Sequence, residues 1–121
     1  MSDKIYDFDQ ICDKVKQLDA KIRFVGVINE RGRLVAGGLK DGAEPLETER
    51  DDEMLYMELA LRVKMRREFD KQLGSVNFAL AQRAKALAMS FPLDYDTLYV
   101  VAESSIDYSK LPDAVLKIIR K

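Results

Sequence analysis

The segment from about Asp51 to Leu73 carries more apolar side chains than one side of a helix can hold. Acidic residues crowd its start and basic residues its second half, the charge order that a helix dipole favours, and Gly74 is suited to end the helix. The apolar residues form two stripes at helical spacing: Met54, Met57, Leu61 and Met65 in one, and Leu55, Leu59 and Val63 in the other. Because one sheet covers only one stripe, we predict that Met54, Met57, Leu61 and Met65 contact a second subunit or a partner protein.

The rest of the chain alternates between the periods of helices and strands. A three-four apolar spacing predicts helices over 5–18 and from Ser109 onward, and shorter apolar or alternating runs predict strands. The strands are expected at 22–28, 34–37, 76–81, 86–91 and 98–103. Short turns join most of them, so the sheet is mainly antiparallel. The predicted class is α/β of the α+β type: a single domain over 1–121, in the order α-β-β-α-β-β-β-α, with a five-stranded sheet.

Composition excludes several functions. The chain has no histidine, which rules out a Ser-His-Asp triad and imidazole zinc ligands, and its one cysteine, Cys12, cannot form an internal disulfide. Cys12 lies on the apolar stripe of the first helix, where we predict a buried thiol. The net charge is −1. We therefore predict no catalytic site, no cofactor and no metal, and we expect a cytoplasmic protein without a signal peptide or a membrane span.

The order of elements resembles that of the profilin-like group, and specifically that of roadblock/LC7 domains, over almost the whole chain. That resemblance implies a dimeric scaffold or a regulator of small GTPases. The segments 22–28, 65–70 and 89–93 (IRFVGVI, MRREFD and MSFPL) are also similar to an uncharacterised family of small archaeal proteins, which implies no activity. PAS and GAF sensor domains are built on a similar sheet.

A basic cluster is the second candidate site. We predict that it binds anionic groups or an acidic partner surface. The simpler interpretation is a solvated helix end paired with Glu58, Glu68 and Asp70. The cluster consists of Arg62, Arg66, Arg67, Arg83 and Lys85.

Three further groups of residues have a structural and a functional interpretation each. The acidic residues between Glu44 and Glu53 lack the spacing of a calcium loop, and a helix start attracts acids in any case. The tyrosines at 56, 95, 99 and 108 either line a ligand pocket or pack in the core and at its rim. Alanines at 79, 81, 86 and 88 leave one side of the later strands flat, ready for a helix or a second subunit.

These observations favour a non-catalytic, homodimeric interaction module, with a small GTPase as a partner by resemblance alone. The alternative is a small-molecule sensor of the PAS or GAF kind, which requires a pocket of several hundred Å³ between the sheet and the central helix. Nucleic-acid binding through the basic cluster is less favoured, because nearby acids cancel most of its field.

Overall fold

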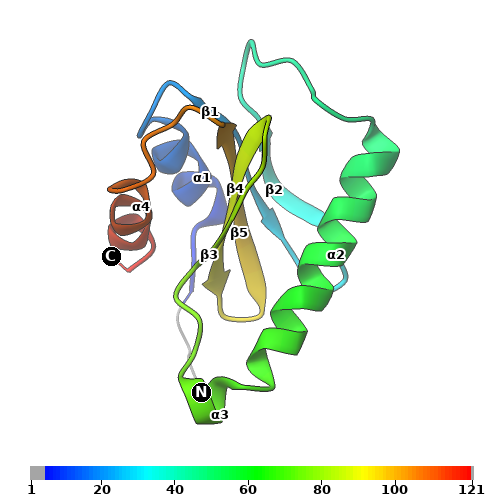
Figure 1. The fold of residues 1–121 in the computed structure, drawn as a ribbon, viewed down its shortest axis with the longest axis vertical. Helices are drawn as coiled ribbons and strands as arrows, with labels where there is room; N and C mark the ends of the chain where they lie inside the picture. The colour runs from blue at the N-terminus through cyan, green and yellow to red at the C-terminus, as the bar shows by residue number, and fades with distance from the viewer. Residues whose placement is uncertain (1–4, 121) are drawn as a thin grey trace.

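A computed structural model describes residues 5–120, so the prediction about the chain start at 1–4 falls outside the described residues. Five antiparallel strands form one sheet in the order β2-β1-β5-β4-β3 (Figure 1). The elements are α1 (Phe8–Lys16), β1 (Ile22–Ile28), β2 (Leu34–Leu39), α2 (Glu49–Arg67), α3 (Asp70–Leu73), β3 (Ala79–Gln82), β4 (Ala86–Leu93), β5 (Asp96–Glu103) and α4 (Leu111–Ile119). The predicted class and order are confirmed, with the short α3 as an addition.

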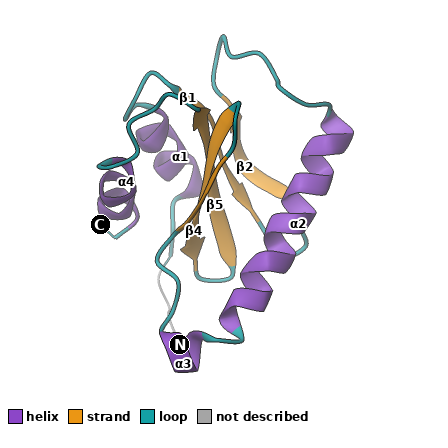
Figure 2. Cartoon of the chain, in the orientation of Figure 1, coloured by secondary structure: helices purple, strands orange, loops and turns teal. Residues whose placement is uncertain are grey.

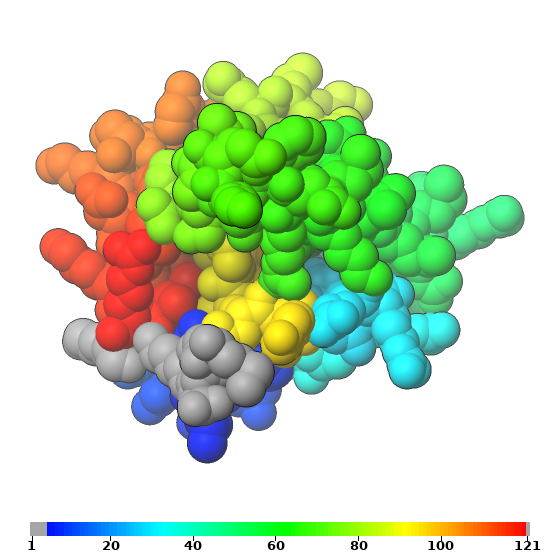
Figure 3. All heavy atoms as spheres, turned by 90° about the horizontal axis from the view of Figure 1, so that it is seen from below, coloured from blue at the N-terminus to red at the C-terminus, as the bar shows by residue number. Residues whose placement is uncertain are grey.

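The two faces of the sheet differ in how they are covered. Helices α1 and α4 lie side by side on one face, and α2 crosses the other (Figure 2). The main core lies on the α1–α4 side, where alternate residues of β4 and β5 such as Phe91 and Leu98 are fully buried against Val15 and Val115. Seen from below, α2 and α3 lie on one side of the β4–β5 turn, and α1 and α4 lie on the other (Figure 3).

The later strands begin and end differently from the prediction. β3 starts only at Ala79; before it, Asn77 accepts a hydrogen bond from the Arg120 side chain and Phe78 packs its ring on Phe91. β4 continues through Pro92, although proline lacks an amide donor. β3 pairs only as far as Ser90, so Pro92 lies where one side of β4 has no neighbouring strand. A two-residue turn with Asp94 at φ 58° then leads into β5.

Helix ends are set by short-range hydrogen bonds. The Asp7 side chain accepts from the Gln10 amide at 3.1 Å, and Thr48 Oγ1 accepts from the Asp51 amide at 3.2 Å, as N-caps do. The predicted long central helix is interrupted after Arg67, and α3 ends at Gly74 (φ 83°) as expected. The last helix begins one residue later than predicted, with Lys110 instead of Ser109 at its cap position.

Cys12 is 1% exposed, which confirms the buried thiol. Burial raises the pKa of Cys12 from 9.0 to about 11, with Lys16 opposing the rise. An unfolded chain therefore loses this proton at lower pH than the folded one, so stability is complete below pH 9.0 and falls as the pH rises toward 11. We expect the free energy of unfolding to drop by up to ~1.4 kcal/mol per pH unit in that window.

Urea unfolding at a series of pH values would measure this drop. A Cys12→Ala variant provides the control, because it lacks the thiol: its stability should decline less steeply above pH 9.0 than that of the parent chain. Identical slopes for the two chains would contradict the assignment to Cys12.

Within residues 5–120, none of the helices combines the length and the apolar character needed to cross a bilayer.

Candidate functional site

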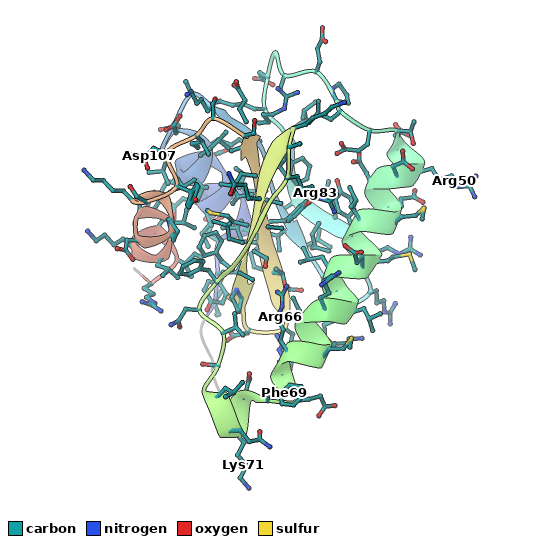
Figure 4. All side chains as sticks on the ribbon, viewed as in Figure 1. Arg50, Arg66, Phe69, Lys71, Arg83 and Asp107 are labelled. Atoms are coloured by element: carbon teal, nitrogen blue, oxygen red, sulfur yellow. The ribbon has the colours of Figure 1, made fainter. Side chains whose placement is uncertain are left out.

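The outer side of α2 presents the stripe that the sequence leaves without a partner. Met54, Met57, Leu61 and Met65 are 63%, 61%, 60% and 59% exposed, and we call this surface the methionine stripe. Phe69, just beyond the end of α2, is similarly exposed and continues it (Figure 4). Large exposed apolar patches commonly mark interaction surfaces.

The inner side of α2 rests on the sheet through a small cluster. Tyr56, Leu59 and Val63 are buried there, with Ile28 of β1 beneath them. This confirms the predicted second stripe in Leu59 and Val63, while Leu55 is only partly covered. The β1–β2 turn also abuts α2: a Cβ at Gly32 would lie 2.7 Å from the Met57 Cα.

Three of the five predicted basic residues line one cleft between α2 and the β3–β4 pair. Arg62, Arg66 and Arg83 surround a volume of about 250 Å³, which we call the arginine cleft. Its floor includes Ala79, Ala81 and Ala88, so the predicted flat alanine surface does lie beside a helix. Arg66 and Arg83 both point into the space between the sheet and α2 (Figure 4).

The arginine cleft is only partly neutralised by the protein. Arg62 Nε lies 3.7 Å from Glu58 Oε1, and Arg66 Nη1 donates to Ser90 Oγ at 3.4 Å. Burial, with Arg62 close by, lowers the pKa of Arg66. The Glu58–Arg62 pair is the single ion pair among residues 5–120, so the expected pairing with Glu68 and Asp70 does not form.

The other two basic residues are separated from this cleft. Arg67 turns toward the β4–β5 turn, where it donates to the Asp94 carbonyl and places its guanidinium 5.6 Å from the Tyr95 ring centroid. Lys85 is exposed in the β3–β4 turn and is not among the residues lining the cleft. The predicted cluster of five is therefore a cluster of three.

A second cleft lies on the opposite side of α2, between its first turns, β1–β2 and the loop at 40–48. It measures about 290 Å³, and three aromatic side chains from three elements line it: Phe24, Tyr56 and Tyr99. Their ring centroids are 6.1 Å (Phe24–Tyr56), 5.9 Å (Phe24–Tyr99) and 6.4 Å (Tyr56–Tyr99) apart, distances typical of interacting rings. We call it the aromatic cleft.

Carboxylates surround the aromatic cleft. Four carboxylates and one guanidinium line it: Glu44, Glu47, Glu49, Asp52 and Arg23. Burial raises the pKa of Glu47, and a hydrogen bond with the Asp52 carboxyl adds to the rise. Burial also raises the pKa of Tyr56 to about 12 and raises that of Tyr99, with nearby carboxylates contributing to both.

The acidic group is nonetheless not arranged for a metal. No three carboxylate or thiol side chains within residues 5–120 are grouped closely enough to hold an ion. Glu49, Asp51 and Asp52 occupy the first turn of α2, where acidic side chains interact favourably with the helix dipole.

Sequence reasoning named Tyr56 and Tyr99 only as general pocket candidates and treated Phe24 as part of a strand. The spacing of Glu49, Asp52 and Tyr56 at three and four residues was a usable signal, because it places them on one side of a helix. Gly26 was another: its missing Cβ leaves room for the Phe24 ring, which lies 2.9 Å from where that Cβ would be.

The comparisons with known proteins agree with this architecture. The roadblock/LC7 domain from Streptomyces avermitilis superposes with a TM-score of 0.70 at 12% identity, covering 95% of this chain and 93% of that one. MglB from Myxococcus xanthus gives 0.71 at 15% identity (98% and 93% covered). The gliding protein MglB from Thermus thermophilus gives 0.67 at 12% identity (92% and 87% covered).

Identities this low establish a shared fold. Among curated proteins, none matches the sequence. One family model, described as a family of unknown function (DUF6659), matches residues 2–121. The chain thus belongs to the DUF6659 family and has the roadblock/LC7 fold.

Proposed function

We propose that this protein is a non-catalytic interaction module that pairs with a second copy of itself through the methionine stripe. The observation that carries this proposal is the exposure of Met54, Met57, Leu61 and Met65, each about three-fifths accessible on the outer side of α2. Burying a Met or Leu side chain contributes about 1.5–3 kcal/mol, so leaving four of them in water has a substantial cost that association removes.

The charges of α2 favour an antiparallel arrangement of the two copies. Acidic residues occupy its first turn and basic residues its last turn. A two-fold axis through the middle of the stripe places the acidic end of one helix beside the basic end of the other, and brings Met54 opposite the Met65 of the second copy. Glu53 and Lys64 flank the stripe on the same side, so this arrangement also brings their opposite charges together.

The dimer is proposed to act as a scaffold or a regulator of a small GTPase. This part of the proposal comes from the roadblock/LC7 fold and the similarity to MglB proteins. The arginine cleft is the proposed contact for acidic groups of that partner, because three guanidinium groups line it beside a single paired carboxylate.

Sedimentation velocity of the full chain at micromolar concentration tests the self-association. We expect the mass of a dimer, with dissociation as the concentration falls, since interfaces of this kind bind by buried apolar area. If the sedimentation coefficient is that of a monomer at all micromolar concentrations, the proposed self-association is wrong.

A small-molecule sensor is the second candidate function. The clefts between α2 and the sheet favour it, because the aromatic cleft approaches the size of known ligand sites, roughly 300–1,000 Å³, and combines aromatic walls with a few polar groups.

A further inference from the structure

The aromatic cleft has the composition of a site for a positively charged organic group. Phe24 of β1, Tyr56 of α2 and Tyr99 of β5 present three rings within 6.4 Å of one another. The faces of aromatic rings attract cations, by about 0.5–2 kcal/mol for each favourable contact. Leu34, Leu39 and Leu46 add apolar wall around the rings, which suits the alkyl body of a ligand.

The electrostatic balance of the cleft is negative. Four carboxylates line it against one guanidinium, that of Arg23, which donates to the Glu44 carbonyl. None of these carboxylates forms an ion pair with a side chain of residues 5–120. Burial raises the pKa of Glu47, and the neighbouring Asp52 adds to the rise, so a cation placed between these two acids would offset their unfavourable proximity.

The Tyr56 side chain supplies an observation independent of the acids. It is 8% exposed, and its hydroxyl has no hydrogen-bond partner among residues 5–120. Since no fully buried polar atom in that range lacks a partner, the Tyr56 hydroxyl keeps some access to solvent, and Tyr56 is among the residues that line the aromatic cleft.

We propose that the aromatic cleft binds an organic ammonium ion: an alkyl chain against Phe24 and Tyr99, with its charged nitrogen between Glu47, Asp52 and the Tyr56 hydroxyl. The cleft volume of about 290 Å³ accommodates a short alkylamine. A hard metal ion fits less well, because Phe24 and the leucine side chains supply no ligands and the carboxylates are not grouped around one point. The site is separate from the proposed dimer surface.

The test is an NMR titration of the full chain with n-pentylammonium, and with 1-pentanol as the uncharged ligand of the same length. We expect pentylammonium to shift the ring signals of Phe24, Tyr56 and Tyr99, and to bind at least roughly tenfold more tightly than pentanol. A capped lysine, Nα-acetyl-lysine N-methylamide, distinguishes the sources of the ammonium group. Its binding indicates a partner's side chain, and binding of pentylammonium alone indicates a free amine.

Two variants locate the site. Glu47→Gln should weaken pentylammonium binding about tenfold, since it removes one carboxylate near the nitrogen. Glu58→Gln, an equivalent change on the arginine-cleft side of α2, should leave the affinity unchanged within about twofold. The proposal is overturned if pentylammonium at millimolar concentration leaves the three ring signals in place, if pentanol binds equally well, or if both variants behave alike.

Discussion

A chain in which Met57 and Leu61 are both replaced by glutamate is expected to be a monomer at concentrations where the parent chain is a dimer. Both residues lie at the centre of the methionine stripe and are about 60% exposed in the single subunit. In a two-fold dimer each substitution occurs twice, so four buried apolar contacts are lost and four like charges face one another. At about 1.5 kcal/mol or more for each contact, the dissociation constant should rise by on the order of a thousandfold or more.

The fold itself should tolerate this change, because neither side chain contributes to the buried clusters of the subunit. Far-ultraviolet circular dichroism would verify that, and sedimentation equilibrium would give the dissociation constants. Ile5→Glu is a suitable control: it places the same charge on an apolar residue that is 93% exposed and lies before α1. Persistence of the dimer in the double variant, with its fold intact, would rule out the methionine stripe as the interface.

Among the glycine-to-alanine substitutions, Gly37→Ala is expected to destabilise the fold most. Gly37 in β2 has φ 76°, and a Cβ there would lie 2.1 Å from the Val25 carbonyl oxygen and 2.9 Å from Cys12 Sγ. The backbone conformation alone costs about 1–2 kcal/mol for a residue other than glycine. The overlap with the β1 backbone cannot be relieved by a rotamer change, so we expect a total loss of at least ~3 kcal/mol of unfolding free energy.

Gly42→Ala provides a matched control for this prediction. Gly42 has nearly the same conformation, φ 82°, but nothing lies within 4 Å of the position of its Cβ. It should therefore lose only the conformational part, about 1 kcal/mol. Urea denaturation of the two variants separates backbone strain from steric overlap, and equal losses in both would show that contact with β1 and Cys12 has no role.

The local features of this chain could be predicted from its sequence, because they depend on neighbours along the chain. The period of α2 separated Leu59 and Val63, which are buried on the sheet, from Met57 and Leu61, which are exposed in the single chain; the predicted partner contact of the latter two stays a prediction. The position of β4 beyond Phe91 could not be predicted in the same way. A proline is unfavourable within a strand that has neighbours on both sides. Pro92 is tolerated in β4 because β3 pairs only as far as Ser90, so Pro92 has a neighbouring strand on the β5 side alone.

The candidate sites depended more heavily on contacts between distant segments. The aromatic cleft joins Phe24, Tyr56 and Tyr99, and two of these rings meet only because Gly26 of β1 pairs with Tyr99 of β5. Arg67 shares the α2 charge pattern with Arg66, yet the Asp94 carbonyl, presented by the β4–β5 turn, draws its side chain away. The spacing of residues along the sequence predicts neither the register of β1 with β5 nor the contact of Arg67 with the β4–β5 turn.

The sparse attachment of α2 has a thermodynamic consequence. Its buried contacts form a cluster distinct from the main core, so we expect separation of α2 from the sheet to cost less free energy than unfolding of the whole domain. Because residues of both α2 and the strands line the aromatic cleft, a ligand bound there would stabilise the helix in its position on the sheet. If the proposed dimer forms through the methionine stripe of the docked helix, we expect it to be linked to that ligand: each would strengthen the binding of the other by the same factor, without direct contact.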